Sequence, residues 1–262
     1  MKKLLTLLLL FTSCSAFSGV SFVDSFDVSS QETGNRGIAF SSDGTKFFVV
    51  GYQGDDVGEY HMSTAWDVST ASYDSAFSVN SQEAKPHGLA FNTDGTKMFV
   101  SGYEGDDVNE YTLSTAWDVS TATFVDSTSK LDDDGRDVKF NPDGTKMFVL
   151  GRHNNDRVYE LALSTAFDVS TASSVDEFPI HLQETASNSL AFNLDGTKMF
   201  VMGSSGDDIN EYTLSTGFDL STASYAGDDE RFSVKTQEGF PMGLAFNSDG
   251  TKMYVTGWNG DN

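Results

Sequence analysis

Hydrophobic and polar positions repeat along this chain in units of about fifty residues. One unit contains residues 88–102, G-L-A-F-N-T-D-G-T-K-M-F-V-S-G, in which two apolar runs flank an Asp-Gly pair. The turn aspartates are spaced 51, 49, 52 and 54 residues apart and are Asp43, Asp94, Asp143, Asp195 and Asp249. A period of this length over almost the whole chain indicates a repeat architecture.

The pattern within each unit predicts four strands. In the second unit, residues 89–91 and 97–101 are two apolar strands around a tight hairpin, in which Gly95 supplies the positive φ of the turn. Residues 108–113 alternate polar and apolar side chains, as a half-buried strand does. Residues 123–128 form the outer strand, and no segment has a helical period.

Four-stranded units repeated in series, without helices, predict an all-β fold, a β-propeller. The stretch 88–102 resembles the G-x-A-x-x-x-D-G-x-x-x-Y-V signature of the YVTN family of propeller repeats. It is similar, more loosely, to TolB-like and WD-repeat propellers. The resemblance covers residues 20–262 and implies the fold, but it leaves the function open because this scaffold serves many chemistries.

The predicted strands do not add up to a whole number of four-stranded blades. Four complete units are followed by a partial fifth that stops after its second strand, and the units start near residues 37, 88, 137, 189 and 243. Residues 20–28 match the outer strand at 73–79 and are expected to complete the last blade. The chain is then either a five-bladed ring with a defective closing blade or a fragment of a larger ring. We favour the fragment, because an open propeller exposes unpaired strand edges.

The net charge indicates which partners are excluded, and the first residues of the chain indicate where the protein is located. A formal net charge of −23 repels phosphate backbones and anionic lipid, which excludes nucleic acid as a partner. Residues 1–18 have a basic end, an apolar run and small residues, which is typical of a secretory signal. Alternatively, residues 11–14 resemble a lipobox, so that residues 1–13 are the signal and Cys14 carries a lipid, the chain's one contact with a membrane. Both alternatives predict an extracytoplasmic protein, which is periplasmic, displayed on the cell surface or secreted.

Adjacent aspartates recur in the G-x-x-G-D-D loops. They are Asp55, Asp56, Asp106, Asp107, Asp207 and Asp208. A catalytic carboxylate pair is expected once in a ring, so a motif present three times is better explained by polar turn residues. Weak calcium binding is the alternative and the one cofactor considered, although the spacing of an EF-hand loop is absent.

Two other repeated features have both a binding and a packing interpretation. The lysines that follow each hairpin could form a binding patch, but are expected to flank the turn: Lys46, Lys97, Lys146, Lys198 and Lys252. An aromatic residue in the turn after each third strand could stack on sugars, but is expected to pack between blades: Trp66, Trp117, Phe167 and Phe218.

The third unit departs from the repeat in two loops on one face, at residues 131–137 and 151–157. These loops could bring charged residues to the channel mouth: Asp133, Asp134, Arg136, Asp137, Arg152, His153 and Arg157. Arg36 and His87 precede the inner strands of the first two units and are expected at the same mouth, as are Asn188 and Met242. A histidine beside arginines and carboxylates can carry out acid–base chemistry or hold an anion.

These observations predict an exported, non-enzymatic β-propeller that binds a protein or glycan partner through this face, where the loops differ. A lactonase-like or other hydrolase acting at the mouth, near His153 and Arg136, is one alternative. Lactonase-type propellers with a central calcium use Glu, Asp and Asn at the mouth, and only Asn188 fits that pattern. A structural repeat of a surface or of a virion fibre is the other alternative. No residue is assigned as catalytic.

Overall fold

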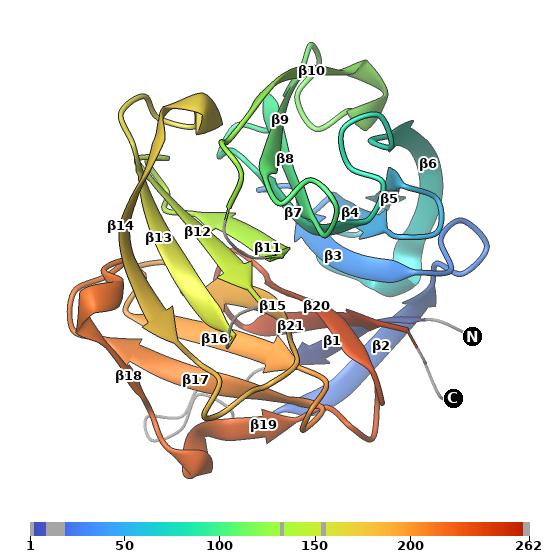
Figure 1. Cartoon of the computed structure of the whole chain (residues 1–262). Coiled ribbons are helices and arrows are strands. Elements are labelled where there is room, and N and C mark those ends of the chain that lie inside the picture. Colours follow the sequence, from blue (N-terminus) through green and yellow to red (C-terminus); the bar gives the residue numbers. More distant parts are fainter. Residues whose placement is uncertain (1–2, 9–18, 132–133, 153–155, 259–262) are drawn as a thin grey trace.

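The computed structural model describes residues 3–8, 19–131, 134–152 and 156–258. The protein is a β-propeller in which four blades are each built from consecutive strands, and a fifth sheet joins the two ends of the chain (Figure 1). The predicted all-β architecture of four complete repeats and a partial fifth is therefore confirmed.

Each blade is an antiparallel sheet whose strands run from the inside of the ring to the outside. Blade 1 contains β3 (Asn35–Phe40), β4 (Lys46–Gly51), β5 (Asp56–Met62) and β6 (Ala71–Ser78). Blade 2 contains β7 (Pro86–Phe91), β8 (Lys97–Gly102), β9 (Val108–Leu113) and β10 (Ala122–Ser127).

Blade 3 contains β11 (Gly135–Phe140), β12 (Lys146–Gly151), β13 (Arg157–Leu163) and β14 (Ala172–Pro179). Blade 4 contains β15 (Ser187–Phe192), β16 (Lys198–Gly203) and β17 (Asp208–Leu214), and its outer strand is split into β18 (Ala223–Tyr225) and β19 (Arg231–Ser233). A single 3-10 turn precedes the outer strand of each blade: η1 (Val68–Thr70), η2 (Val119–Thr121), η3 (Val169–Thr171) and η4 (Leu220–Thr222). A further 3-10 turn, η5 (Asp228–Glu230), lies between β18 and β19.

The fifth sheet has the order β2-β1-β21-β20. Its inner strands are β20 (Pro241–Phe246) and β21 (Lys252–Gly257), and its outermost strand is β2 (Ser21–Asp27), as predicted for residues 20–28. Strand β1 (Lys3–Leu8) fills the position of the third strand and pairs with both neighbours, Thr6 with Tyr254 and with Asp24. The strand that the fifth unit lacks is thus supplied by the start of the chain.

The inner strands contact one another in the cyclic order β3, β7, β11, β15, β20 and back to β3, and they surround the central channel (Figure 1). Three of the five inner strands have glycine at the position of closest approach: Gly37, Gly88 and Gly243. A Cβ atom on Gly37 would overlap the carbonyl oxygen of His87, and one on Gly243 would overlap the carbonyl oxygen of Arg36. Glycine at this position therefore lets neighbouring inner strands pack closely enough to close the ring.

Five apolar clusters lie between neighbouring sheets and form the core. Phe48 of blade 1, for example, packs with Leu89 and Val100 of blade 2. In the part of the chain that the structure describes, no helix is long and apolar enough to cross a membrane.

Candidate anion site at the mouth of the channel

We call the face that carries the loops before the inner strands the top face, and the face that carries the Asp-Gly hairpins the bottom face. At the top, the second residue of each inner strand stands at the channel mouth in all five sheets. These residues are Arg36, His87, Arg136, Asn188 and Met242, as the sequence predicted. All except Arg136 are buried, and the side chain of Arg136 is 13% exposed.

Arg152 joins three of these residues to form what we call the arginine cluster: Arg36, His87, Arg136 and Arg152. Nη1 of Arg136 lies 3.1 Å from Nε2 of His87, and Nη1 of Arg152 donates to Oδ1 of Asn188 at 3.3 Å. The other end of that amide, Nδ2 of Asn188, donates to the carbonyl oxygen of Pro241 at 2.8 Å. Asn188 is therefore fixed in the orientation that presents its oxygen to an arginine.

Burial and mutual repulsion disturb the protonation of this cluster. Burial, together with the charges of Arg136 and Arg152, lowers the pKa of Arg36 to about 10. Burial and the same arginines hold the pKa of His87 well below its usual value. The arginines remain charged at neutral pH, whereas His87 is neutral, so the mouth is strongly cationic within a chain of net charge −23.

Three guanidinium nitrogens in the cluster are buried and make no hydrogen bond in the described part of the chain: Nε and Nη1 of Arg36, and Nε of Arg136. Among the described residues, Arg136 has one carboxylate partner, Asp134, whose Oδ2 lies 3.3 Å from Nη2. Buried N–H donors without acceptors cost about 1–3 kcal/mol each, so the site is built to receive an acceptor. An anion would supply both the missing acceptor and the missing negative charge.

Aromatic rings surround the arginines, and the sequence analysis did not single them out. The guanidinium of Arg36 lies 4.4 Å from the ring centre of Trp258 and 5.2 Å from that of Tyr52. Arg136 lies 5.2 Å from the ring of Tyr103, which is 40% exposed. Tyr52, Tyr103 and Trp258 each follow the glycine that ends the second strand of a sheet, a register that Arg152 shares. That shared register is the signal that could have identified them.

The other residues predicted at this mouth lie in different places in the structure. Asp134 is in the site, but Asp137 lies deeper, where Oδ2 accepts from Ser189 at 2.6 Å and Oδ1 pairs with Lys139 at 2.6 Å. Asp137 stands where three other inner strands have glycine, and its hydrogen bond with Ser189 joins β11 to β15. Its side chain therefore does not face a ligand. Arg157 also lies elsewhere, on β13, where it pairs with Glu177 at 2.6 Å. Asp133 and His153 lie outside the described residues.

The repeated aspartate pairs act as turn residues. The first aspartate of each pair has a positive φ of 50–52°: Asp55, Asp106 and Asp207. The second is half-buried in blades 1 and 2 and buried in blade 4, and burial raises its pKa in all three: Asp56, Asp107 and Asp208. In the described ranges of the chain, no group of three or more His, Cys, Asp or Glu residues could hold a metal ion. Calcium binding stays a prediction.

Buried glutamates hold the top loops together. They come from the S-Q-E-type loops and are Glu32, Glu83, Glu184 and Glu238. Oε2 of Glu83 accepts from the backbone N–H of Gly105 at 2.8 Å, and Oε1 accepts from the backbone N–H groups of Lys85 at 2.6 Å and of Glu104 at 3.2 Å. One carboxylate thus joins the loop before an inner strand to the loop that follows the second strand.

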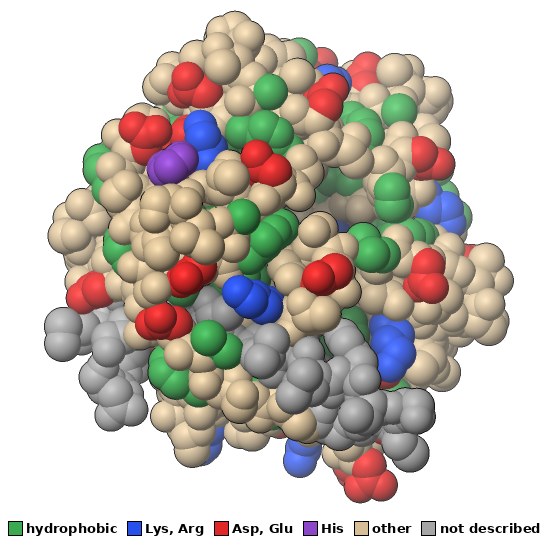
Figure 2. Space-filling view, turned by 180° about the vertical axis from the view of Figure 1, so that it is seen from behind, with side chains coloured by type: hydrophobic (Ala, Val, Ile, Leu, Met, Phe, Trp, Pro, Cys, Tyr) green, Lys and Arg blue, Asp and Glu red, His purple; other side chains and the backbone are tan. Residues whose placement is uncertain are grey.

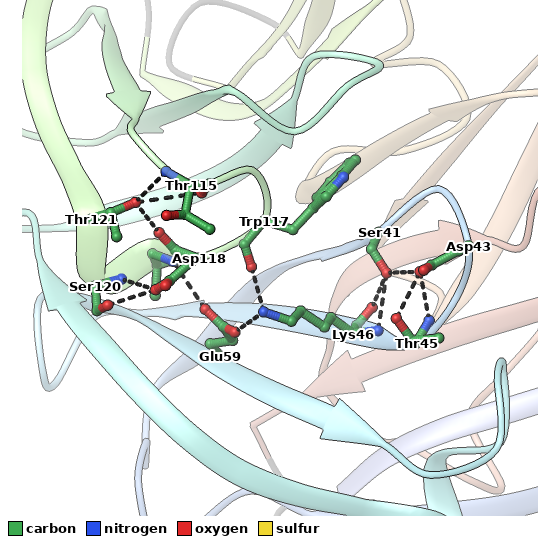
Figure 3. A network of polar contacts seen from close by, with 11 residues as sticks. Ser41, Asp43, Thr45, Lys46, Glu59, Thr115, Trp117, Asp118, Ser120 and Thr121 are labelled. Atoms are coloured by element: carbon green, nitrogen blue, oxygen red, sulfur yellow. Dashed lines mark hydrogen bonds and ion pairs between the residues drawn. The ribbon is translucent and has the colours of Figure 1, made fainter.

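On the bottom face, the repeated lysines and aromatic turns form a latch between blades (Figure 3). Lys46 pairs with Glu59 of its own blade and donates to the carbonyl oxygen of Trp117 in blade 2 at 2.8 Å, while Oε2 of Glu59 accepts from Val119 at 2.9 Å. The Trp117 ring packs 5.2 Å from Phe91 and 6.2 Å from Phe48. The aromatic turns therefore pack between blades, and the lysines hold the next blade in addition to flanking their own hairpin.

The channel opens on the bottom face into an apolar cavity of about 860 Å³. The inner strands line it with phenylalanines: Phe40, Phe91, Phe140, Phe192 and Phe246. Figure 2 shows hydrophobic side chains around a central hollow. Lys139 also lines this cavity, but its amine pairs with Asp137.

Known proteins resemble this chain in structure only. No protein-family model matches the sequence, and the comparison with curated proteins found no match. A protein from Bacteroides uniformis, provisionally described as a 6-phosphogluconolactonase, is 14% identical with a TM-score of 0.53, and the match covers 89% of this chain and 68% of that one. A protein of unknown function from Desulfotomaculum acetoxidans is 11% identical with a TM-score of 0.51, covering 96% and 72%. These likenesses show the propeller fold alone.

Proposed function

We propose that the protein is a non-enzymatic binding propeller whose arginine cluster holds an anionic group of a glycan partner. The observation that carries this proposal is the set of buried guanidinium N–H groups of Arg36 and Arg136 that have no acceptor in the described part of the chain. Sulfate, phosphate and carboxylate groups accept from guanidinium groups in a charge-assisted and bidentate way. Arg36, His87, Arg136 and Asn188 all stand on strands, so little backbone ordering is lost on binding.

The aromatic rings favour a sugar as the carrier of this anion. Tyr52, Tyr103 and Trp258 flank the arginines, and Phe240, 38% exposed, lies 6.5 Å from Trp258. Aromatic side chains present an apolar face to a sugar ring and, in Tyr and Trp, a polar group at the edge. A site that combines cationic donors with such rings fits a uronic acid or a sulfated or phosphorylated sugar.

Calorimetric titration with three related oligosaccharides tests the proposal: an uncharged one, its uronic-acid counterpart and its sulfated counterpart. The charged ligands should bind at least tenfold more tightly than the uncharged one, and Arg36→Gln should remove that difference. Arg157→Gln is the matched control, because this arginine pairs with Glu177 away from the mouth. Equal affinity for all three oligosaccharides would overturn the proposal. Binding to acidic peptides in place of sugars would indicate a protein partner.

A lactonase is the second candidate, which the fold likeness to the Bacteroides uniformis protein supports as much as it supports a binding role. The phosphate of a phosphorylated sugar lactone would suit the arginine cluster. His87 is a poor general base here, because Nε2 lies 3.1 Å from a guanidinium donor that occupies its lone pair. Hydrolysis of 6-phosphogluconolactone above the spontaneous rate, lost in Arg136→Gln, would establish the enzyme.

We also propose that the repeats are of the YVTN type and that the protein is exported. Removal of residues 1–18 would take away β1 and leave β21 and β2 without the strand between them. Mass spectrometry of the protein recovered from the extracytoplasmic fraction tests this proposal. A mass starting at Gly19 supports secretion, and a lipid on Cys14 supports the anchored form. Retention of the whole chain in the cytoplasm contradicts both.

A further inference from the structure

Strand β1 takes the third position of the fifth sheet, but its sequence differs from those of the other third strands. In those strands a buried glutamate pairs in register with a phenylalanine of the second strand, and the four are Glu59, Glu110, Glu160 and Glu211. The same register in the fifth sheet pairs Thr6 with Tyr254. Strand β1 therefore completes the sheet without the glutamate that every blade has at this position.

That glutamate is one half of the bottom-face latch. In blade 2, Lys97 donates to the carbonyl oxygen of Phe167 in the next blade at 2.6 Å. Its partner Glu110 accepts from the N–H of Val169, two residues later, at 3.1 Å. Blades 1 and 3 make the same two contacts with the blades that follow them. A complete latch therefore needs a lysine from the second strand and a glutamate from the third.

The latch between the fifth sheet and blade 1 has the lysine but not the glutamate. Lys252 donates to the carbonyl oxygen of Trp66 at 2.7 Å, as the other lysines do to their aromatic turns. Among the described residues, no carboxylate pairs with Lys252, and no group accepts from the N–H of Val68, which is a buried residue. A lysine and a buried N–H group therefore lack the same carboxylate, which marks this position of the sheet as incompletely filled.

The outermost strand of this sheet, β2, is held by blade 1 and not by β1 alone. The ring centre of Phe26 lies 6.1 Å from that of Phe47 and 5.8 Å from that of Tyr60, and both of these residues belong to blade 1. Val28, which directly follows β2, is buried in the same apolar cluster. Departure of β1 would therefore leave β21 and β2 on either side of a gap one strand wide, each with an unpaired edge.

We propose that the place of β1 between β21 and β2 is a strand-acceptor site, which a strand of a partner polypeptide fills once β1 is removed with residues 1–18. This inference rests on the proposed export of the protein. The added strand pairs antiparallel with β21 and β2 and carries a glutamate in register with Tyr254. That glutamate completes the latch, because it pairs with Lys252 and accepts from the N–H of Val68. The backbone of such a strand supplies affinity, and its alternate side chains supply selectivity.

The other third strands define the sequence that this site takes. They share an apolar residue two positions before the glutamate, Tyr or Leu directly after it, and Leu or Met three positions after it. In β9 these residues are Val108, Tyr111 and Leu113, and all three are buried. A second copy of this chain is not the donor, because each of its own third strands already lies between two others, and the release of one would open a blade. The partner is therefore a separate protein that displays this pattern.

Fluorescence anisotropy with a labelled peptide of residues 106–114, Asp-Asp-Val-Asn-Glu-Tyr-Thr-Leu-Ser, tests the proposal. We expect saturable binding to the processed protein recovered from the extracytoplasmic fraction and to the full-length Leu5→Pro variant, in which proline weakens the pairing of β1. The full-length wild type should bind at least tenfold less tightly, because β1 occupies the site. A peptide with glutamine in place of the glutamate should bind each protein at least tenfold less tightly than the original peptide. Each protein is unchanged in that comparison, so its folding does not enter the result.

A lysine variant tests the same contact from the side of the protein. Lys252→Met should lower the affinity for the peptide at least tenfold, whereas Lys85→Met, whose lysine pairs with Glu104 in another sheet, should leave it unchanged. Retention of the whole chain in the cytoplasm contradicts export, but the full-length Leu5→Pro variant still tests the acceptor site. Failure of all these proteins to bind the peptide, or equal binding of its glutamine form, would overturn the acceptor site even in an exported protein. Dimers of the processed protein that the peptide dissociates would overturn the separate partner and identify a second copy as the donor.

Discussion

Nη1 of Arg136 lies 3.1 Å from Nε2 of His87, and the two residues come from neighbouring inner strands. Arginine cannot accept a hydrogen bond, so Nε2 of His87 must be the unprotonated nitrogen and the proton must reside on Nδ1. Together with burial, this contact explains why the pKa of His87 lies well below its usual value. The imidazole is a fixed neutral spacer that accepts from one arginine, and its protonation would place a fourth positive charge in the cluster.

Acidification should destabilise the protein through His87. In the unfolded chain this histidine takes up a proton near pH 6.5, whereas in the folded chain it does so only at much lower pH. Its contribution to stability is therefore complete above pH 6.5 and is lost as the pH falls towards the folded pKa, at up to about 1.4 kcal/mol per pH unit. Urea unfolding at pH 7.5, 6.5 and 5.5 should show this slope in the wild type and a shallower one in His87→Asn.

His61→Asn is the control for the histidine experiment. His61 is exposed on β5 of blade 1, so its replacement should leave the slope of the wild type unchanged. Parallel slopes for the wild type and His87→Asn would contradict the neutral, buried state of His87.

Sulfate should stabilise the protein specifically through Arg36. The unpartnered Nε and Nη1 of Arg36 are available to an oxyanion, and a ligand at one hundred times its Kd adds about 2.7 kcal/mol to the free energy of unfolding. We expect the melting temperature in sodium sulfate, compared with sodium chloride at equal ionic strength, to rise more for the wild type than for Arg36→Gln. Arg157→Gln should behave like the wild type. The same increment in all three proteins would mean that sulfate acts only as a general stabilising salt.

Gly102→Ala should strongly destabilise blade 2. A Cβ atom on Gly102 would overlap the side chain of Glu83, which accepts backbone N–H groups from both top loops of the blade. Overpacking of this kind costs roughly 1–3 kcal/mol, and displacement of the carboxylate adds the loss of its hydrogen bonds. Chemical denaturation measures the effect. Gly239→Ala is the control, because a Cβ atom there has no neighbour within 4 Å, and an equal loss in both variants would refute the steric argument.

The same substitution should have different costs at Glu110 and at Glu211. Glu110→Gln weakens both the pair with Lys97 and the charge-assisted bond from Val169, whereas among the described residues Glu211→Gln weakens only the pair with Lys198. A hydrogen bond to a charged group contributes about 1.5–3 kcal/mol. Glu110→Gln should therefore lower the free energy of unfolding by at least ~1 kcal/mol more than Glu211→Gln. Equal losses would show that the backbone bond to Val169 contributes little.

The sequence predicted the repeated parts of the fold well, because one local pattern recurs with every blade. The hairpin at Gly95 has the positive φ expected, 73°, and the turn of Trp117 packs between blades. The sequence did not reveal the latch. Glu110 looks like an outward polar residue of an alternating strand, and only the approach of the next blade buries it and gives it two partners.

The candidate site was predicted in part for a related reason. The rule that residues before the inner strands share the channel mouth placed Arg36, His87 and Arg136 correctly. It could not distinguish Asp137, one residue further along the strand, which turns away to bond with Ser189. The missing strand of the fifth sheet was also unpredictable, because an apolar run such as Lys3–Leu8 fits a signal segment and a central strand equally well.

The latches of blades 1, 2 and 3 point in one direction around the ring, from the lysine–glutamate pair of one blade to the turn of the next. Closure by contrast depends on the fifth sheet, whose β1 is hydrogen-bonded both to β2 near the start of the chain and to β21 near its end. In the chain that keeps residues 1–18, a tensile load applied between the two ends would therefore fall first on those hydrogen bonds. The pairing of β1 with β2 and β21 is thus the first part of the ring to open under force, and the four blades bear the load only afterwards.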